Sequence, residues 1–300
     1  DFEKKREIDD IYILSAYVED RAGNRSISRE VEFSVNRFGS TYRFEMEPLS
    51  SITKETEKGV YQYVREEFDV VLTEVNVDEL KKEKTKIRMS KDGVLTELEE
   101  NNDYSVTTKK KKKWREYTYR IFHERFVQDG HYEVEVRSED KATNINENTD
   151  KNKQANIKFA VDKTAPKILP GDLENNTQYP LENKKVKITV NDNLKLSGVK
   201  MYLNENEIVY NNEDDDYFIT IPSANQKQNL RIVAYDVAEN EQTETIEGFL
   251  ISTNLFVRWY NNLPLFVGTL SASGILVVIG ILIIILRRIK KKEREKEAVH

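Results

Sequence analysis

The sequence predicts an all-β chain of tandem β-sandwiches, followed by one transmembrane α-helix at its C-terminal end. A strand–turn–strand pattern with the turn Asp-x-Ala-x-Asn occurs three times, with its aspartates at positions 20, 140 and 236. This spacing matches the size of a sandwich domain, which is about 100 residues. An apolar stretch without charges then lies close to the end of the chain, and it is as long as the roughly 20 residues that cross a bilayer.

Each copy of the pattern has two segments in which apolar and polar residues alternate, one on either side of the turn. The copies cover residues 13–37, 132–163 and 230–251. Alternation with period two is typical of a strand that buries one face, so each copy predicts a β-hairpin. Asp and Asn suit the turn because their side chains bond nearby backbone groups, and Asn tolerates positive φ. The residues with this predicted structural role in the repeated turn are Asp20, Asn24, Asp140, Asn144, Asp236 and Asn240.

Shorter segments of the same kind predict the remaining strands of the two complete repeats. In the middle repeat these are residues 41–46, 68–77, 86–89, 104–107 and 114–121. The pair Asp92-Gly93 follows the third of them and is a strong signal for a tight hairpin turn. In the last repeat the predicted strands are residues 186–190, 199–203 and 217–221.

The middle hairpin is followed by Val-Asp-Lys-Thr-Ala-Pro at residues 161–166. Together, these motifs resemble the bacterial immunoglobulin-like repeat that occurs in tandem on large surface proteins of Gram-positive bacteria. The resemblance covers nearly all of residues 1–252. It implies that each hairpin forms the last two strands of a sandwich and that Asp162–Pro166 is the joint to the next domain. The equivalent segments, Asn36–Gly39 and Ser252–Asn254, depart from the joint motif.

This resemblance implies a domain organisation. Residues 1–36 are the closing strands of a truncated immunoglobulin-like domain, and residues 37–162 and 163–252 are two complete sandwiches. Residues 253–262 form a juxtamembrane linker, 263–286 the transmembrane helix and 287–300 a basic cytoplasmic tail.

The apolar stretch Leu263–Leu286 contains no charged residue, and the tail that follows it has seven Lys and Arg against three Asp and Glu. Basic flanks of membrane helices stay in the cytoplasm. The sequence therefore predicts a single-pass protein of the cell membrane, with its N-terminus outside and its C-terminus inside. Arg258, Trp259 and Tyr260 stand where an interfacial anchor is expected.

Leu263–Val267 is similar to the start of the Leu-Pro-x-Thr-Gly signal of wall-sorted proteins, which also precedes an apolar stretch and a basic tail. The Thr-Gly pair between which a sortase cuts is missing from this position. The sequence therefore predicts a retained membrane anchor.

The composition excludes several classes of site. The chain has no Cys and three His, so disulfides, Cys-ligated metals and Cys nucleophiles are ruled out. It has no H-E-x-x-H, no G-x-S-x-G and no Gly-rich phosphate loop. We therefore expect no catalytic residue, no cofactor and no metal ligand, and no enzyme activity in this chain. Without the tail, 40 Lys and Arg stand against 50 Asp and Glu, which argues against nucleic acid as a partner.

Two charged runs interrupt the strands. The lysine run, Lys109, Lys110, Lys111, Lys112 and Lys113, is interpreted as a solvated hairpin loop, with a weak contact to a polyanion such as a wall polymer as the alternative. The acidic run Glu213–Asp216 is interpreted as a solvated loop in the same way. Calcium is the alternative there and at the joints around Asp140 and Asp162, because calcium takes six to eight oxygen ligands.

The features together predict a membrane-anchored surface stalk or adhesion-type protein. Its expected partners are the lipid bilayer and either a cell-wall polymer or a ligand on a host or neighbouring cell. The alternative is the spacer and anchor of a larger surface enzyme whose catalytic domain lies before residue 1.

Overall fold

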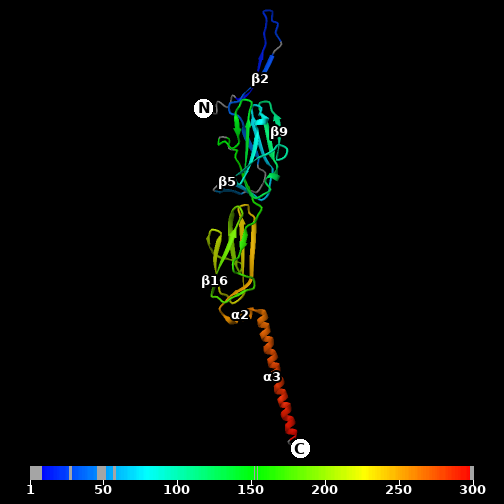
Figure 1. Ribbon diagram of the computed structural model, residues 1–300, viewed down its shortest axis with the longest axis vertical. Coiled ribbons are helices and arrows are strands. Elements are labelled where there is room, and N and C mark those ends of the chain that lie inside the picture. The colour runs from blue at the N-terminus through cyan, green and yellow to red at the C-terminus, as the bar shows by residue number, and fades with distance from the viewer. Residues whose placement is uncertain are drawn as a thin grey trace. The chain divides into compact units, whose positions relative to one another are not determined.

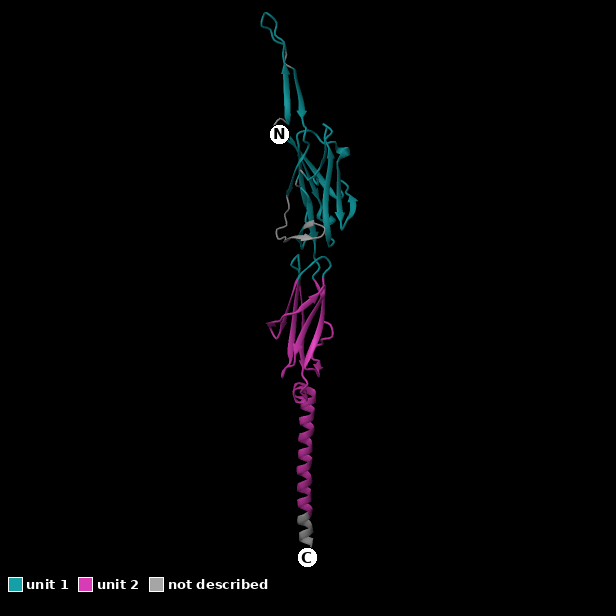
Figure 2. Ribbon diagram, turned by 90° about the vertical axis from the view of Figure 1, so that its left-hand side faces the viewer, with its two compact units in different colours: residues 1–165, 192–197, 235–240 teal, residues 166–191, 198–234, 241–300 magenta. Residues whose placement is uncertain are grey.

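The computed structural model of the chain describes residues 9–26, 29–45, 52–56, 59–151, 153 and 155–297. The chain forms two compact units (Figure 2). Unit 1 comprises residues 1–165 with the short segments 192–197 and 235–240, and unit 2 comprises residues 166–191, 198–234 and 241–300. The predicted fold class, immunoglobulin-like β-sandwiches followed by one apolar C-terminal helix, is confirmed (Figure 1).

Unit 1 contains a sandwich of two sheets. The first has the order β3 (Thr41–Glu45), β6 (Val70–Asn76), β10 (Arg115–Ile121) and β9 (Tyr104–Lys110). The second has the order β4 (Ile52–Thr56), β5 (Gly59–Val64), β13 (Ile157–Val161), β11 (Gly130–Glu139), β7 (Lys86–Lys91) and β8 (Val94–Glu97), with β12 (Ile145–Glu147) also paired to β11. Strands β5 and β13 pair in parallel, and the other pairs are antiparallel. Two single-turn 3₁₀ helices, Lys82–Lys84 and His123–Arg125, connect strands.

The predicted Asp-Gly turn is confirmed. Lys91 pairs with Val94, which leaves Asp92 and Gly93 as a two-residue loop with φ of 50° and 88°. Positive φ at both central residues is the type I′ geometry that fits the twist of a hairpin. Met46, the last residue of the predicted opening strand, lies outside the described residues.

The core of unit 1 follows from the alternation in β11, where every second residue from Gly130 to Ser138 is buried. At its centre Phe159 is fully buried, and its ring lies 4.9–5.5 Å from those of Phe68, Phe126 and Tyr132. Contacts between aromatic rings stabilise a fold beyond the effect of the apolar area that the rings bury.

Strand β6 places a carboxylate inside this sandwich. Glu74 of β6 is fully buried and accepts hydrogen bonds from Ser40 and Ser138, each at 2.5 Å, and from the Tyr119 hydroxyl at 3.0 Å. Burial raises the pKa of Glu74, although these hydroxyl donors partly oppose the rise.

We expect Glu74→Gln to change how stability depends on pH. Because the pKa of Glu74 is higher in the folded state than in the unfolded one, its ionisation removes stability as the pH rises through the folded pKa. The advantage of wild type over Glu74→Gln should therefore shrink as the pH rises from the unfolded pKa of Glu, about 4.3, through the raised folded pKa, by about 1.4 kcal/mol for each unit of the pKa rise. Urea unfolding of both proteins at several pH values measures this difference. A difference independent of pH would contradict the expectation.

The first repeat is a two-stranded sheet of β1 (Asp10–Ala16) and β2 (Arg29–Val35). It matches the hairpin predicted there, and its antiparallel register pairs Tyr12 with Phe33, whose rings stack at 5.6 Å.

Unit 2 repeats the strand order of unit 1. One sheet has the order β14 (Lys167–Leu169), β16 (Asn183–Asn191), β20 (Asp216–Pro222) and β19 (Asn211–Glu213). The other has the order β15 (Gln178–Tyr179), β22 (Glu241–Ile251), β21 (Gln228–Asp236), β17 (Leu196–Leu203) and β18 (Asn206–Glu207). As in unit 1, the last strand pairs in parallel with a short early strand, here β15.

Two helices end the chain, α2 (Leu255–Asn261) and α3 (Leu263–Glu297) (Figure 1). The predicted linker 253–262 thus contains α2, whose first N–H groups are capped by the Asn254 side chain. The Trp259 ring packs on that of Phe266 at 4.8 Å and its indole N–H donates to Thr269. Within α3, Leu263–Lys290 has a mean hydropathy of 2.7 in its most apolar window, and none of that window is buried.

Candidate cation site

The same turn closes all three repeated hairpins, and its hydrogen bonds are nearly identical in each copy. The Asp backbone N–H donates to the Asn carbonyl at 2.9–3.1 Å, and the Asp carboxylate accepts the backbone N–H and the side-chain amide of the Asn at 2.7–2.9 Å. The positive φ expected for Asn falls instead on the residue before it, which is Gly23, Thr143 or Glu239. The two side-chain bonds hold the Asn in place, so the chain reverses one residue earlier.

The last of these turns lies against the end of β13. The Asn240 side chain donates to the carbonyl oxygen of Asp162 at 2.9 Å, while the Asp162 backbone N–H donates to Val64 at 2.9 Å. Loop 192–197 lies beside the same turn, because the Val237 N–H donates to the Lys195 carbonyl at 3.0 Å. These contacts, all within unit 1, bring a third acidic residue, Asp192, next to Asp162 and Asp236.

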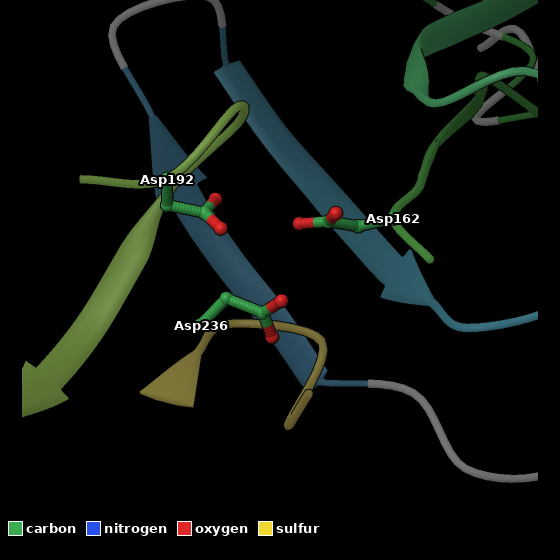
Figure 3. Close-up of side chains that lie close together, drawn as sticks. All are labelled: Asp162, Asp192 and Asp236. Atoms are coloured by element: carbon green, nitrogen blue, oxygen red, sulfur yellow. The ribbon is translucent and has the colours of Figure 1, made fainter. Parts of the chain in front are cut away.

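Three carboxylates converge at this point (Figure 3). One oxygen from each of Asp162, Asp192 and Asp236 lies within 4.8 Å of the other two. Asp162 and Asp236 are 0% and 2% exposed, and Asp192 is half-buried. Both carboxylate oxygens of Asp162, and Oδ1 of Asp192, have no hydrogen-bond partner within the part of the chain that the structure describes. The other oxygen of Asp192 accepts the N–H groups of Leu194 and Lys195, at 2.9 and 2.7 Å.

The electrostatics of the three groups oppose ionisation. Burial and, after it, the carboxylates of Asp192, Asp236 and Asp129 together raise the pKa of Asp162 to about 7, against an opposing effect from the Thr164 backbone. Burial also raises the pKa of Asp236, against the lowering effect of its bonds from Asn240. The three groups therefore disfavour one another's ionisation, and a positive charge among them would favour their ionised forms.

An apolar cluster lies beside this site. It consists of Tyr61, Tyr63, Ala160, Val237 and Ala238, with Leu194 packed against it. The nearby Arg65 guanidinium donates to the backbone carbonyls of Ala238 and Glu239, each at 2.6 Å, and so fixes the turn from its other side.

The structure also places the charged runs. Lys109 and Lys110 lie in β9, and Lys111–Lys113 form the exposed turn to β10. Lys113 pairs with Asp10 at 2.6 Å and Lys111 with Glu116 at 3.9 Å, so part of the charge of the lysine run is compensated. Contact with a polyanion stays a prediction.

In the acidic run, Glu213 ends β19, Asp214 and Asp215 form the exposed turn, and Asp216 begins β20. Its last residue, Asp216, pairs with Lys187 at 2.7 Å. The run does not gather its oxygens around one point among the described residues, whereas the residues near Asp162 do. Sequence reasoning considered calcium at the joint around Asp162 but missed Asp192, and it assigned no metal ligand.

The sequence matches no protein-family model and no curated protein. Similar solved structures include fibronectin(III)-like modules of CbhA from Clostridium thermocellum. The sequence identity is 12%, the match covers 72% of this chain and 96% of that chain, and the TM-score is 0.29. A second match is to the complex of Dpr2 Ig1-Ig2 with DIP-Theta Ig1-Ig3. The sequence identity is 13%, the match covers 70% of this chain and 66% of that chain, and the TM-score is 0.36. A Ca²⁺-stabilized adhesin with which an Antarctic bacterium binds ice shows 11% identity, 81% and 57% coverage, and a TM-score of 0.26.

Proposed function

We propose that the chain is a surface stalk of a Gram-positive bacterium, held in the cell membrane by α3. The observation that carries the proposal is the order of its parts. Immunoglobulin-like units are followed directly by an apolar helix whose segment Leu263–Lys290 is 28 residues long. This length exceeds the roughly 20 residues that a bilayer core requires.

The proposed orientation has the β-units outside and the basic tail in the cytoplasm. The seven Lys and Arg that follow Leu286 support this direction by the positive-inside rule. The aromatic cluster of Trp259 and Tyr260 from α2 and Phe266 from the start of α3 fits the headgroup level of the outer face.

In this proposal the β-units act by holding a position outside the membrane, and not by catalysis. Each sandwich buries its own apolar core, so its stability is local and a distal region is carried at a distance set by the number of units. A cell-wall polymer or a ligand on a host or neighbouring cell is the proposed partner of the exposed surface.

The test uses the absence of cysteine from the sequence, because one introduced Cys is then the only thiol. Gln226→Cys lies on the exposed surface of unit 2, and Lys296→Cys lies in the tail. In intact cells a membrane-impermeant maleimide should label Gln226→Cys and leave Lys296→Cys unlabelled until the cells are permeabilised. The unsubstituted chain is the control for background labelling.

Two results would overturn the proposed function. One is labelling of the tail variant, and not the unit 2 variant, in intact cells. The other is recovery of the chain in the soluble fraction without detergent.

A further inference from the structure

Unit 1 contains a second arrangement that corresponds to the three aspartates, one repeat earlier in the chain. The Asn240 amide donates to the carbonyl oxygen of Asp162, and in the same way the Asn144 amide donates to the carbonyl oxygen of Asn36, at 3.0 Å. Asp162 and Asn36 are each the first residue after the closing strand of a hairpin. They therefore occupy equivalent positions.

The second member of each set is also equivalent. Asn76 ends β6 and accepts the N–H of Asp78, two residues on, at 2.8 Å. Asp192 directly follows β16 and accepts the N–H of Leu194, also two residues on, at 2.9 Å. Strands β6 and β16 hold the same place in their sheets. The third members are the turn aspartates, Asp140 and Asp236.

The earlier set needs no cation, because two of its three carboxylates are replaced by amides. Asn36 Nδ2 donates to the Asp140 carboxylate and to Asn76 Oδ1, both at 2.8 Å. Asn76 Nδ2 donates to the Ser40 hydroxyl at 2.8 Å and to the same Asp140 oxygen at 3.3 Å. The single buried negative charge of Asp140 is thus surrounded by donors, as a buried charge requires.

The later set has the same positions and no such donors. Asp162 is fully buried, and its carboxylate points toward those of Asp192 and Asp236 (Figure 3), with neither oxygen bonded among the described residues. A buried carboxylate without a hydrogen-bond donor is costly. Protonation supplies one donor for each carboxyl group and leaves its other oxygen without one. A bound cation satisfies all three groups at once.

The chemistry of the donors selects the ion. All three donors are carboxylates, which suit hard cations such as calcium, magnesium and manganese. Two oxygens that share a calcium ion at about 2.4 Å lie at most about 4.8 Å apart. The three described oxygens already meet this limit. Calcium tolerates irregular geometry and completes its shell with water, whereas magnesium demands a near-ideal octahedron at about 2.1 Å.

We propose that Asp162, Asp192 and Asp236 bind one calcium ion, and that Asn36, Asn76 and Asp140 form the cation-independent version of the same cluster. Of these two equivalent clusters, only the later one, with three aspartates, then takes up an ion. The ion fixes loop 192–197 and turn 235–240 to the end of β13. This proposal does not depend on the membrane anchor or on its orientation.

The test begins with the full chain in detergent micelles, freed of metal with a chelator and titrated with calcium chloride. Calorimetry should give one binding site. Calcium should also raise the Tm by about 5 °C or more at saturation, because the ion binds the folded state only. Magnesium chloride at the same concentration should give a smaller rise.

The decisive variant converts the later cluster into the earlier one. Asp162→Asn with Asp192→Asn should abolish the heat of titration and the calcium-dependent rise in Tm. In the absence of calcium this variant should melt above the wild type, because its new amides can donate to Asp236. The matched control, Asp214→Asn with Asp215→Asn, removes the same charge from the exposed acidic run and should leave one site.

The converse variant, Asn36→Asp with Asn76→Asp, should create a second calcium site and lower the Tm when calcium is absent. A wild type without heat or Tm change at millimolar calcium would overturn the proposal. So would a calcium response that survives in the Asp162→Asn, Asp192→Asn variant or disappears in the control. A converse variant that folds in calcium and still binds one ion would overturn the equivalence of the two clusters. None of these results bears on the labelling test of membrane orientation.

Discussion

Phe159→Ala is expected to lower the free energy of unfolding of unit 1 by about 3–5 kcal/mol, enough to unfold a marginal domain. Phe159 is fully buried at the meeting point of three other rings, contributed by Phe68, Phe126 and Tyr132. These neighbours come from separate parts of the chain, so the space left by the ring cannot be filled by a local shift. The variant loses both the transfer energy of the ring and the contacts around the cavity.

Hydrogen exchange resolved by peptide measures this effect separately for each unit. In Phe159→Ala, protection should fall throughout β6, β10, β11 and β13 and stay unchanged in the strands of unit 2. Trp114→Ala is the matched control, because it removes an even larger ring whose residue is 40% exposed. It should cost less than about 1 kcal/mol. Equal losses in the two variants would show that the ring cluster is not the centre of the core.

Asp140→Ala is expected to cost unit 1 about 3 kcal/mol, because it leaves several buried donors without an acceptor. The Asp140 carboxylate is fully buried and accepts the amides of Asn36, Asn76 and Asn144 and the backbone N–H of Asn144. Water cannot replace it without opening the end of the sandwich. Urea unfolding of the variant and wild type measures the loss.

The first repeat supplies the control for this change. Asp20 makes the same turn bonds to Asn24 as Asp140 makes to Asn144, but its turn is exposed. In Asp20→Ala, water can take the place of the lost carboxylate, so the loss of stability should be much smaller. If the two substitutions had equal effects, the cost would come from the turn itself and not from the buried amide cluster.

The strands with a regular pattern could be predicted from the sequence, and those without one could not. Every second residue of β11 and of β21 is buried, and in β21 Val233 is buried as well, because one face of each strand fills the core. Strand β4 is Ile-Thr-Lys-Glu-Thr at the edge of its sheet, and β15 has two residues. Their place is set by pairing with other strands and not by a hydrophobic pattern of their own.

The aspartate cluster was partly visible in the sequence. The repeated turn pointed to Asp236, and the joint motif pointed to Asp162. Asp192 carried no signal, because it lies in a polar segment between two strands, and the equivalent residue of the middle repeat is Asn76. Only the fold of unit 1, which brings loop 192–197 and turn 235–240 to the end of β13, identifies it as the third member.

The parallel pairing of the last strand has a mechanical consequence. In unit 1, β13 pairs with β5 at three positions, and in unit 2, β22 pairs with β15 at two. A pull on the two ends of a unit draws such parallel strands past each other along their length. Their hydrogen bonds are then loaded together in shear, and they must fail together, whereas an antiparallel hairpin pulled from its open end separates bond by bond. A unit closed in this way resists extension through the geometry of its last strand, independently of how stable its core is at rest.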